Sequence, residues 1–286
     1  MTKEVAMDKS RPETVVGSKS FTAVAVNCAA KAGEYIKMKL GTTGQPDFKY
    51  SRQDLVTEAD KGTERLIRNL IATHFPHHSF LGEEGVEPGP EASAAALRKA
   101  IEAEYLWIVD PIDGTTNFVH GFPFFAVSIA LARNGQVIVG VVYDPVRDEL
   151  FVAERGKGAY IRGKRMKVSA ERTLGESLLA SGFPADPAMM RLNAREVSTL
   201  AHKARNLRVC GSAALHLAYV AAGRLSGFWE HGLNAWDLAA GSLLVEEAGG
   251  RVTSLTGEPF DLRARDVAAS NGLIHDELLA ALREAE

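Results

Sequence analysis

Residues 107–118 read WIVDPIDGTTNF, an apolar run that ends in two aspartates and a turn. The apolar residues are typical of a buried β-strand, and Asp110 and Asp113 follow at its end. The intervening proline fixes φ, and Gly114 allows the chain to turn sharply. We therefore expect both carboxylates and the carbonyl of Ile112 to face one point.

The rest of the chain has the pattern of a layered protein. Helical spacing of apolar residues predicts helices near 21–40, 57–75, 91–105, 191–203, 212–223 and 236–248. Apolar or β-branched runs predict strands near 79–82, 106–110, 125–132, 136–144, 149–155, 177–182, 250–255 and 266–271. The turn residues DPVRD (144–148) are expected to join the strands at 136–144 and 149–155 as an antiparallel hairpin. Strands grouped with strands, and helices grouped between sheets, favour a layered α+β architecture over a βαβ repeat.

Composition sets the class of protein. The 286 residues are 46% hydrophobic and 24% charged, enough for one large domain or two closely joined halves. A net charge of -3 gives no basic field, so we expect no direct nucleic acid partner and no membrane partner. Cys28 and Cys210 have no metal-binding or disulfide spacing, which favours a reducing cytoplasm. We expect residues 1–18 to form a mobile tail before a single domain at 19–286.

Carboxylates recur at the ends of apolar elements. Desolvating such groups is costly unless a cation or several donors compensate them. Oxygen ligands without His or Cys favour Mg²⁺, and the amides that follow Gly114 could hold a phosphate. The acidic positions are Asp60, Glu83, Glu84, Asp110, Asp113 and Asp237.

Each position alone has a simpler explanation. Thr57 stands three residues before Asp60, which is a capping-box pattern, so Asp60 could simply cap a helix, and so could Asp237. Glu83 and Glu84 could lie in a solvated turn. The combination favours a metal site.

The long segments carry a resemblance to a known family. WIVDPIDGTTNFVHGFPFFAVSIAL (107–131) and WDLAAGSLLVEEAGG (236–250) resemble the two signatures of the inositol monophosphatase family of Mg²⁺-dependent phosphatases. DLVTEAD (54–60), LGEEG (81–85) and GSAALHLAYVAAGRLSGFWE (211–230) resemble its other blocks in the same order. The similarity covers roughly residues 20–272. It implies the αβαβα sandwich shared with fructose bisphosphatases, with a metal-binding half near 19–170 and a substrate-contacting half near 171–286.

The resemblance implies a metal ligand set. Glu83, Asp110 and the Ile112 carbonyl correspond to the first metal's ligands, and Asp110, Asp113 and Asp237 to the second's. Glu83 with waters would hold a weaker third ion. The cofactor is expected to be two to three Mg²⁺ ions, with Mn²⁺ as a substitute.

The resemblance also implies catalytic and substrate-binding roles. Asp60 and Thr115 resemble a pair of residues that, with the first metal, activates the attacking water. Lys49 and the amides of Gly114 and Thr115 correspond to phosphate contacts. The alcohol portion of the substrate would meet Gly211, Ser212, Ala213 and Glu230.

The expected reaction is hydrolysis of myo-inositol 1-phosphate to inositol and phosphate, inhibited by Li⁺, in a cytoplasmic homodimer. One alternative is the same chemistry on fructose 1,6-bisphosphate, histidinol phosphate or a 3'-phosphonucleotide. The other is a regulatory role through protein partners.

Some positions depart from the family pattern. His216 is either a tolerated helix position or a substrate contact. Asn234 and Ala235 also depart, which leaves the substrate open. The loop at 181–195, with its paired methionines, is expected to line the substrate site and set its specificity.

Overall fold

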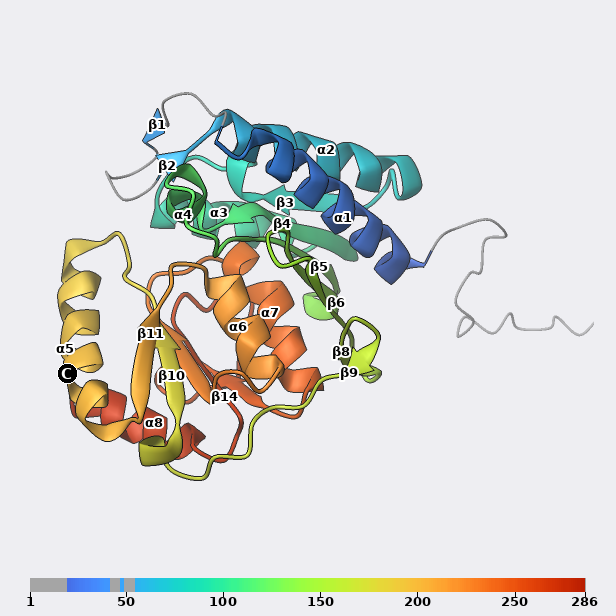
Figure 1. Cartoon of the computed structure of the whole chain (residues 1–286). Helices are drawn as coiled ribbons and strands as arrows, with labels where there is room; N and C mark the ends of the chain where they lie inside the picture. Colours follow the sequence, from blue (N-terminus) through green and yellow to red (C-terminus); the bar gives the residue numbers. More distant parts are fainter. Residues whose placement is uncertain (1–19, 42–46, 49–54, 286) are drawn as a thin grey trace, which may run out of the picture.

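The molecule contains two large β-sheets (Figure 1). A pair of helices lies between the sheets, and further helices cover the outer face of each. The computed structural model describes residues 20–41, 47–48 and 55–285. The αβαβα layering expected from the sequence is confirmed.

The first sheet has seven strands in the order β3-β4-β5-β6-β7-β8-β9. Only β3 and β4 are parallel within it, and the other neighbours are antiparallel. Its strands are β3 (Ser79–Gly82), β4 (Tyr105–Asp113), β5 (Ala126–Arg133), β6 (Gln136–Asp144), β7 (Glu149–Glu154), β8 (Gly158–Ile161) and β9 (Lys164–Arg165).

Helices α1 (Phe21–Lys39) and α2 (Glu58–His74) cover the outer face of this sheet (Figure 1). The Ser20 hydroxyl caps α1, and Thr57 forms the predicted capping box of α2 with Asp60. Apolar side chains of both helices pack with β4, β5 and β6 in one buried cluster. This packing fixes the start of α2 beside the end of β4.

Helices α6 (Ala213–Ala221) and α7 (Ala235–Glu247) form the middle layer. Both are apolar on nearly every side because sheets lie above and below them. The second sheet has the order β11-β10-β12-β14-β13, with α5 (Pro187–Lys203) and α8 (His275–Arg283) on its far side (Figure 1). Its strands are β10 (Leu178–Ser181), β11 (Asn206–Val209), β12 (Gly227–Glu230), β13 (Arg251–Thr253) and β14 (Val267–Ser270).

The second sheet differs from the sequence expectation in one respect. β10 pairs in parallel with both β11 and β12, and α5 and α6 connect these strands. The layered fold therefore contains local βαβ connections, which we did not expect. The short β11 and β12 were missed because β11 is mostly exposed and β12 is only four residues long, so neither gives a clear strand pattern.

Smaller elements complete the chain. They are β1 (Asp47–Phe48), β2 (Leu55–Val56), α3 (Pro90–Ala100), α4 (Thr115–Val119), η1 (Glu83–Gly85) and η2 (Leu174–Glu176). Helix α5 begins four residues earlier than predicted because Asp186 caps it and Pro187 occupies its first turn. Within the described ranges, no helix has the length and apolarity needed to cross a membrane.

Two predictions lie outside the described residues: the tail at 1–18 and the phosphate contact Lys49. The division of 19–286 into a metal-binding and a substrate-contacting half stays a prediction.

Candidate active site

A break in the register of β4 places the two aspartates of the opening segment. Asp110 pairs with Ser128 and Asp113 with Ala126, so three steps on β4 match two on β5. Residues three apart in a regular strand point to opposite faces, whereas one extra residue lets them share a face. Pro111, which lacks an N–H, is tolerated at such an irregularity. The bulge therefore turns both carboxylates toward the middle layer.

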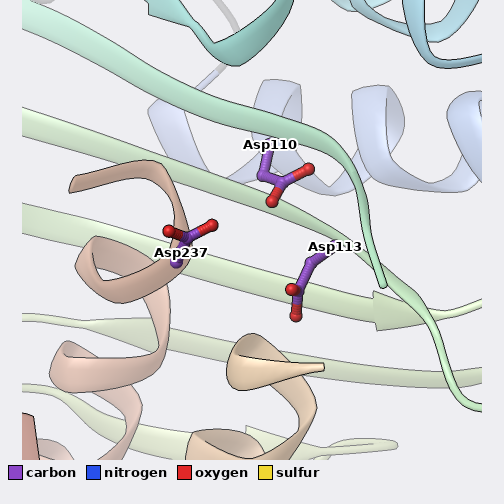
Figure 2. Close-up of side chains that lie close together, drawn as sticks. All are labelled: Asp110, Asp113 and Asp237. Atoms are coloured by element: carbon purple, nitrogen blue, oxygen red, sulfur yellow. The ribbon is translucent and has the colours of Figure 1, made fainter. Parts of the chain in front are cut away.

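The third carboxylate comes from the first turn of α7. Asp237 accepts a 2.7 Å hydrogen bond from the Asn234 amide in a capping box. Ser128, opposite Asp110, donates a 3.0 Å hydrogen bond to the Trp236 carbonyl, which ties this turn to the sheet. One oxygen from each of Asp110, Asp113 and Asp237 lies within 4.8 Å of the others (Figure 2).

Burial makes this acidic cluster unfavourable on its own. Asp110 and Asp113 are almost fully buried. Desolvation raises the pKa of Asp113 to about 6, although the Ser212 hydroxyl and Ala214 amide oppose that rise. Desolvation, then the charges of Glu83 and Asp113, raise the pKa of Asp237 well above its usual value.

Glu83 reaches the same region from the neighbouring strand. Gly82 pairs with Val109 in the parallel β3–β4 ladder, so Glu83 and Asp110 follow at the same edge. The charge of Glu83 raises the pKa values of Asp60, Asp113 and Asp237, after desolvation as the main cause. Glu83 is not part of the tight group of three, but it adds a fourth carboxylate nearby.

Asp60 and Thr115 form a hydrogen-bonded pair. The Thr115 hydroxyl lies 2.9 Å from Asp60 Oδ1 and 3.0 Å from the Ile112 carbonyl oxygen. The amide and hydroxyl of Thr57 donate to Asp60 Oδ2 at 2.8 and 2.6 Å. Asp60 is 1% exposed, and burial raises its pKa despite these donors. Asp60 is thus both a helix cap and a partner of Thr115, so the two readings of this residue are compatible.

The turn after Asp113 lies directly against the start of α6. Gly114 has φ of 97°, a conformation that favours glycine, and a Cβ there would lie 3.0 Å from the Gly211 carbonyl oxygen. The Ser212 hydroxyl caps α6 and also donates to Asp113. Ala213 follows in the first turn, buried. The Ala214 amide also donates to Asp113, at 2.7 Å, so side chain and backbone together hold the start of α6 beside this turn.

Glu230 lies at the end of β12 and faces the acidic cluster. Desolvation, followed by the charges of Asp113 and Asp237, raises its pKa well above the usual value. A Cβ at Gly182 would lie 2.2 Å from a Glu230 carboxylate oxygen, so the loop after β10 packs on this side chain. The predicted substrate contact and the start of the 181–195 segment are therefore neighbours.

His216 lies in the core. It is 1% exposed, between the rings of Phe124 and Phe228 at centroid distances of 5.3 and 5.1 Å. Among the described residues, neither ring nitrogen has a hydrogen-bond partner. Burial lowers its pKa to about 3, so the ring is neutral. This placement favours the tolerated helix position over the substrate contact.

Sequence reasoning missed two residues that hold the site together. Glu64, one helical turn after Asp60, accepts the Glu84 amide at 2.8 Å and so anchors the turn that carries Glu83. Its spacing of four from Asp60 was the available signal. Asn117 donates from its side chain to the carbonyls of Phe124 and Cys210, both at 2.6 Å, and nothing in the local sequence pointed to that role.

The donor set fits a hard divalent cation. The group consists of carboxylates, with the Ile112 carbonyl alongside, and these are oxygen donors. Burial and, to a lesser degree, the charges of neighbouring carboxylates raise the pKa values of Asp113 and Asp237, and bound positive charge would favour their ionised forms. The residues present therefore fit a metal.

Known proteins resemble this chain over nearly its whole length. "Inositol monophosphatase 3" of Solanum lycopersicum is 45% identical over 267 residues, which cover 92% of this chain and 97% of that protein. "Nus factor SuhB" of Pseudomonas aeruginosa is 40% identical over 270 residues, with 91% and 94% covered. The crystal structure of the extragenic suppressor protein suhB from Bartonella henselae superposes with a TM-score of 0.83 at 41% identity, and 92% of this chain and 98% of that chain are covered.

The layered fold, the carboxylate cluster and these relatives define a metal-dependent hydrolase of phosphoric monoesters. The model of the "Inositol monophosphatase family" matches residues 18–286. The chain belongs to that family, and the resemblance in its sequence is confirmed.

Proposed function

We propose that the protein hydrolyses myo-inositol 1-phosphate to inositol and phosphate with Mg²⁺. One observation carries the proposal: three carboxylates converge within 4.8 Å beside a hydrogen-bonded Thr115–Asp60 pair. The names of the tomato and rhizobial relatives, the latter an "Inositol-1-monophosphatase" of Rhizobium meliloti, support the choice of substrate.

Two to three Mg²⁺ ions are proposed, with Mn²⁺ as a substitute. Glu83, Asp110 and the Ile112 carbonyl would hold one, and Asp110, Asp113 and Asp237 a second. Glu83 would contribute to a weaker third. When bound, Mg²⁺ lowers the pKa of water and stabilises negative charge on attacking and leaving oxygens.

Thr115 and Asp60 are the proposed proton path. A water beside Thr115 can donate its proton to the threonine oxygen while the hydroxyl passes its own proton to Asp60, 2.9 Å away. The burial that raises the pKa of Asp60 makes this carboxylate a better proton acceptor near neutral pH.

The phosphate and the alcohol would lie on opposite sides of the acidic cluster. The amides of Gly114 and Thr115, at the start of a helical turn, have no acceptor within that turn and can bind phosphate oxygens. Lys49 would be a further phosphate contact. The backbone of Gly211, Ser212 and Ala213 and the carboxylate of Glu230 would contact the inositol hydroxyls.

Further predictions concern the assembly and location of the enzyme. We propose a homodimer, one domain over 19–286, and a cytoplasmic location. Cys28 and Cys210 are both free thiols, which supports a reducing compartment.

The proposed substrate is tested by phosphate release with a panel of phosphoesters. The panel contains myo-inositol 1-phosphate, fructose 1,6-bisphosphate, histidinol phosphate and a 3'-phosphonucleotide. We expect the highest kcat/KM for myo-inositol 1-phosphate in the presence of Mg²⁺. A higher kcat/KM for another phosphoester of the panel would show that this phosphoester is the substrate, with the same hydrolytic reaction. A stoichiometric protein partner without turnover would favour the regulatory alternative, which the name of the Pseudomonas relative alone does not support.

A further inference from the structure

A buried histidine follows Glu230 directly and joins three elements. His231 Nε2 lies 2.9 Å from both carboxylate oxygens of Glu196 on α5, and its Nδ1 lies 3.6 Å from Asp266. Glu196 is 2% exposed and also accepts the Trp229 indole N–H at 2.9 Å. The histidine thus fixes the end of β12 against α5.

Helix α5 holds the other side of Glu230 as well. Asn193, one turn before Glu196, donates from its side chain to the Gly182 carbonyl at 2.8 Å and lies 3.1 Å from the Ser181 hydroxyl. Gly182 is the residue on which the Glu230 carboxylate packs. The same face of α5 therefore holds both His231, which follows Glu230 in the chain, and Gly182, against which the Glu230 carboxylate packs.

A second set of contacts runs from His231 toward the metal ligand on α7. Asp266 accepts the Gly232 amide at 3.0 Å. Arg265 donates to the Gly232 carbonyl at 2.9 Å and to the Asn234 side chain at 2.7 Å. The Asn234 amide in turn donates to the Asp237 carboxylate. The segment from Glu230 to Asp237 is thus held along its length.

The acidic groups around His231 stabilise the protonated form of its ring. Burial alone lowers its pKa, but the hydrogen bonds and charges of Asp266 and Glu196 raise that pKa to about 9. Arg265 acts on Asp266, and the positive charge of His231 opposes the rise of the Glu230 pKa. Both ring nitrogens therefore carry a proton at neutral pH.

We propose that His231 is a positioning residue for the polyol part of the substrate: held by Glu196 and Asp266, it fixes Glu230 in place to contact the alcohol. The inference rests on the proposed function, because Glu230 is the proposed alcohol contact. Within the described part of the chain, His231 bonds to Glu196 and pairs with Asp266, and not with the proposed metal ligands or the phosphate turn.

The test compares two phosphoesters in three variants. Myo-inositol 1-phosphate offers hydroxyls to Glu230, whereas 4-nitrophenyl phosphate offers none. His231→Gln replaces one ring N–H by a carbonyl acceptor and removes the charge. Asp266→Asn removes only the charge of a partly exposed partner, and serves where His231→Gln folds poorly. The control is His275→Gln at the opposite end of β14, where a buried histidine bonds Thr253 and Ser270.

His231→Gln and Asp266→Asn should raise KM for myo-inositol 1-phosphate, about tenfold in the first variant, with kcat nearly unchanged. Their kcat/KM for 4-nitrophenyl phosphate should match wild type, and His275→Gln should change neither substrate's KM. Equal losses on both substrates, or an unchanged KM for myo-inositol 1-phosphate, would overturn the proposal.

A substrate-free measurement separates this inference from the proposed function. The ¹³C resonance of the Glu230 carboxyl, assigned with Glu230→Gln, should shift in Asp266→Asn and stay in place in His275→Gln. A wild type inactive on myo-inositol 1-phosphate would contradict the proposed function alone. An unshifted Glu230 resonance in Asp266→Asn would contradict the positioning role of His231 alone.

Discussion

The hydroxyl of Thr115 lies 2.9 Å from Asp60 Oδ1, although 55 positions separate the two residues in the chain. One residue opens the turn after β4 and the other closes the capping box of α2. The Thr115 hydroxyl can pass a proton to the buried Asp60 carboxylate. The proposed metal ligands do not provide this proton transfer.

Removing that hydroxyl should slow the chemical step. Thr115→Ala should lower kcat by about 10² to 10⁴, because general base catalysis contributes within that range. KM should change little, since the phosphate contact at this residue is its backbone amide. Thr115→Ser keeps the hydroxyl and should retain most of the activity. Steady-state phosphate release measures both variants, and equal kcat values for the two would refute the proton path.

His216 predicts an acid-sensitive stability. Its folded pKa of about 3 lies below the unfolded value of 6.5, so the unfolded chain binds more protons between these values. The stability associated with the neutral ring is therefore fully present above about pH 6.5 and is lost as the pH falls toward 3. His216→Leu should reduce this acid sensitivity.

The same substitution should stabilise the protein near neutral pH. It removes two ring nitrogens that lack partners among the described residues, and such groups cost about 1–3 kcal/mol when buried. His275→Leu is the matched control, because that equally buried ring bonds Thr253 and Ser270 and its loss should destabilise. Thermal unfolding of both variants at pH 5 and pH 7.5 measures the effect. A His216→Leu protein less stable than wild type at pH 7.5 would contradict this account.

Lithium should inhibit the enzyme. The family resemblance implies that Li⁺ competes at the site of Asp110, Asp113 and Asp237, where oxygen donors suit a small hard cation. Adding LiCl should lower kcat in saturating substrate, while KCl at equal ionic strength should not. Equal effects of the two salts would argue against this site for Li⁺.

Several features followed from the sequence because local rules decide them. The Thr57–Asp60 capping box and the β6–β7 hairpin were predicted from short-range patterns and are present. The convergence of Asp110 with Asp113 was expected from the turn chemistry that includes Gly114.

Other features depend on contacts between distant segments. Nothing near Glu196 in the sequence indicates that it meets His231, because α5 reaches β12 only through the packing of the second sheet. The burial of His216 likewise depends on Phe124, which comes from the loop before β5. The parallel pairing of β10 was missed because its partners lie beyond intervening helices.

The central claim is that the carboxylates at the end of β4 hold the metal on which turnover depends. Asp110→Asn, assayed for phosphate release from myo-inositol 1-phosphate over a range of Mg²⁺ concentrations, tests it most directly. We predict a loss of at least about a hundredfold in kcat/KM, together with a circular dichroism spectrum like that of wild type. Wild-type turnover by a folded Asp110→Asn protein, with unchanged dependence on Mg²⁺, would contradict the account.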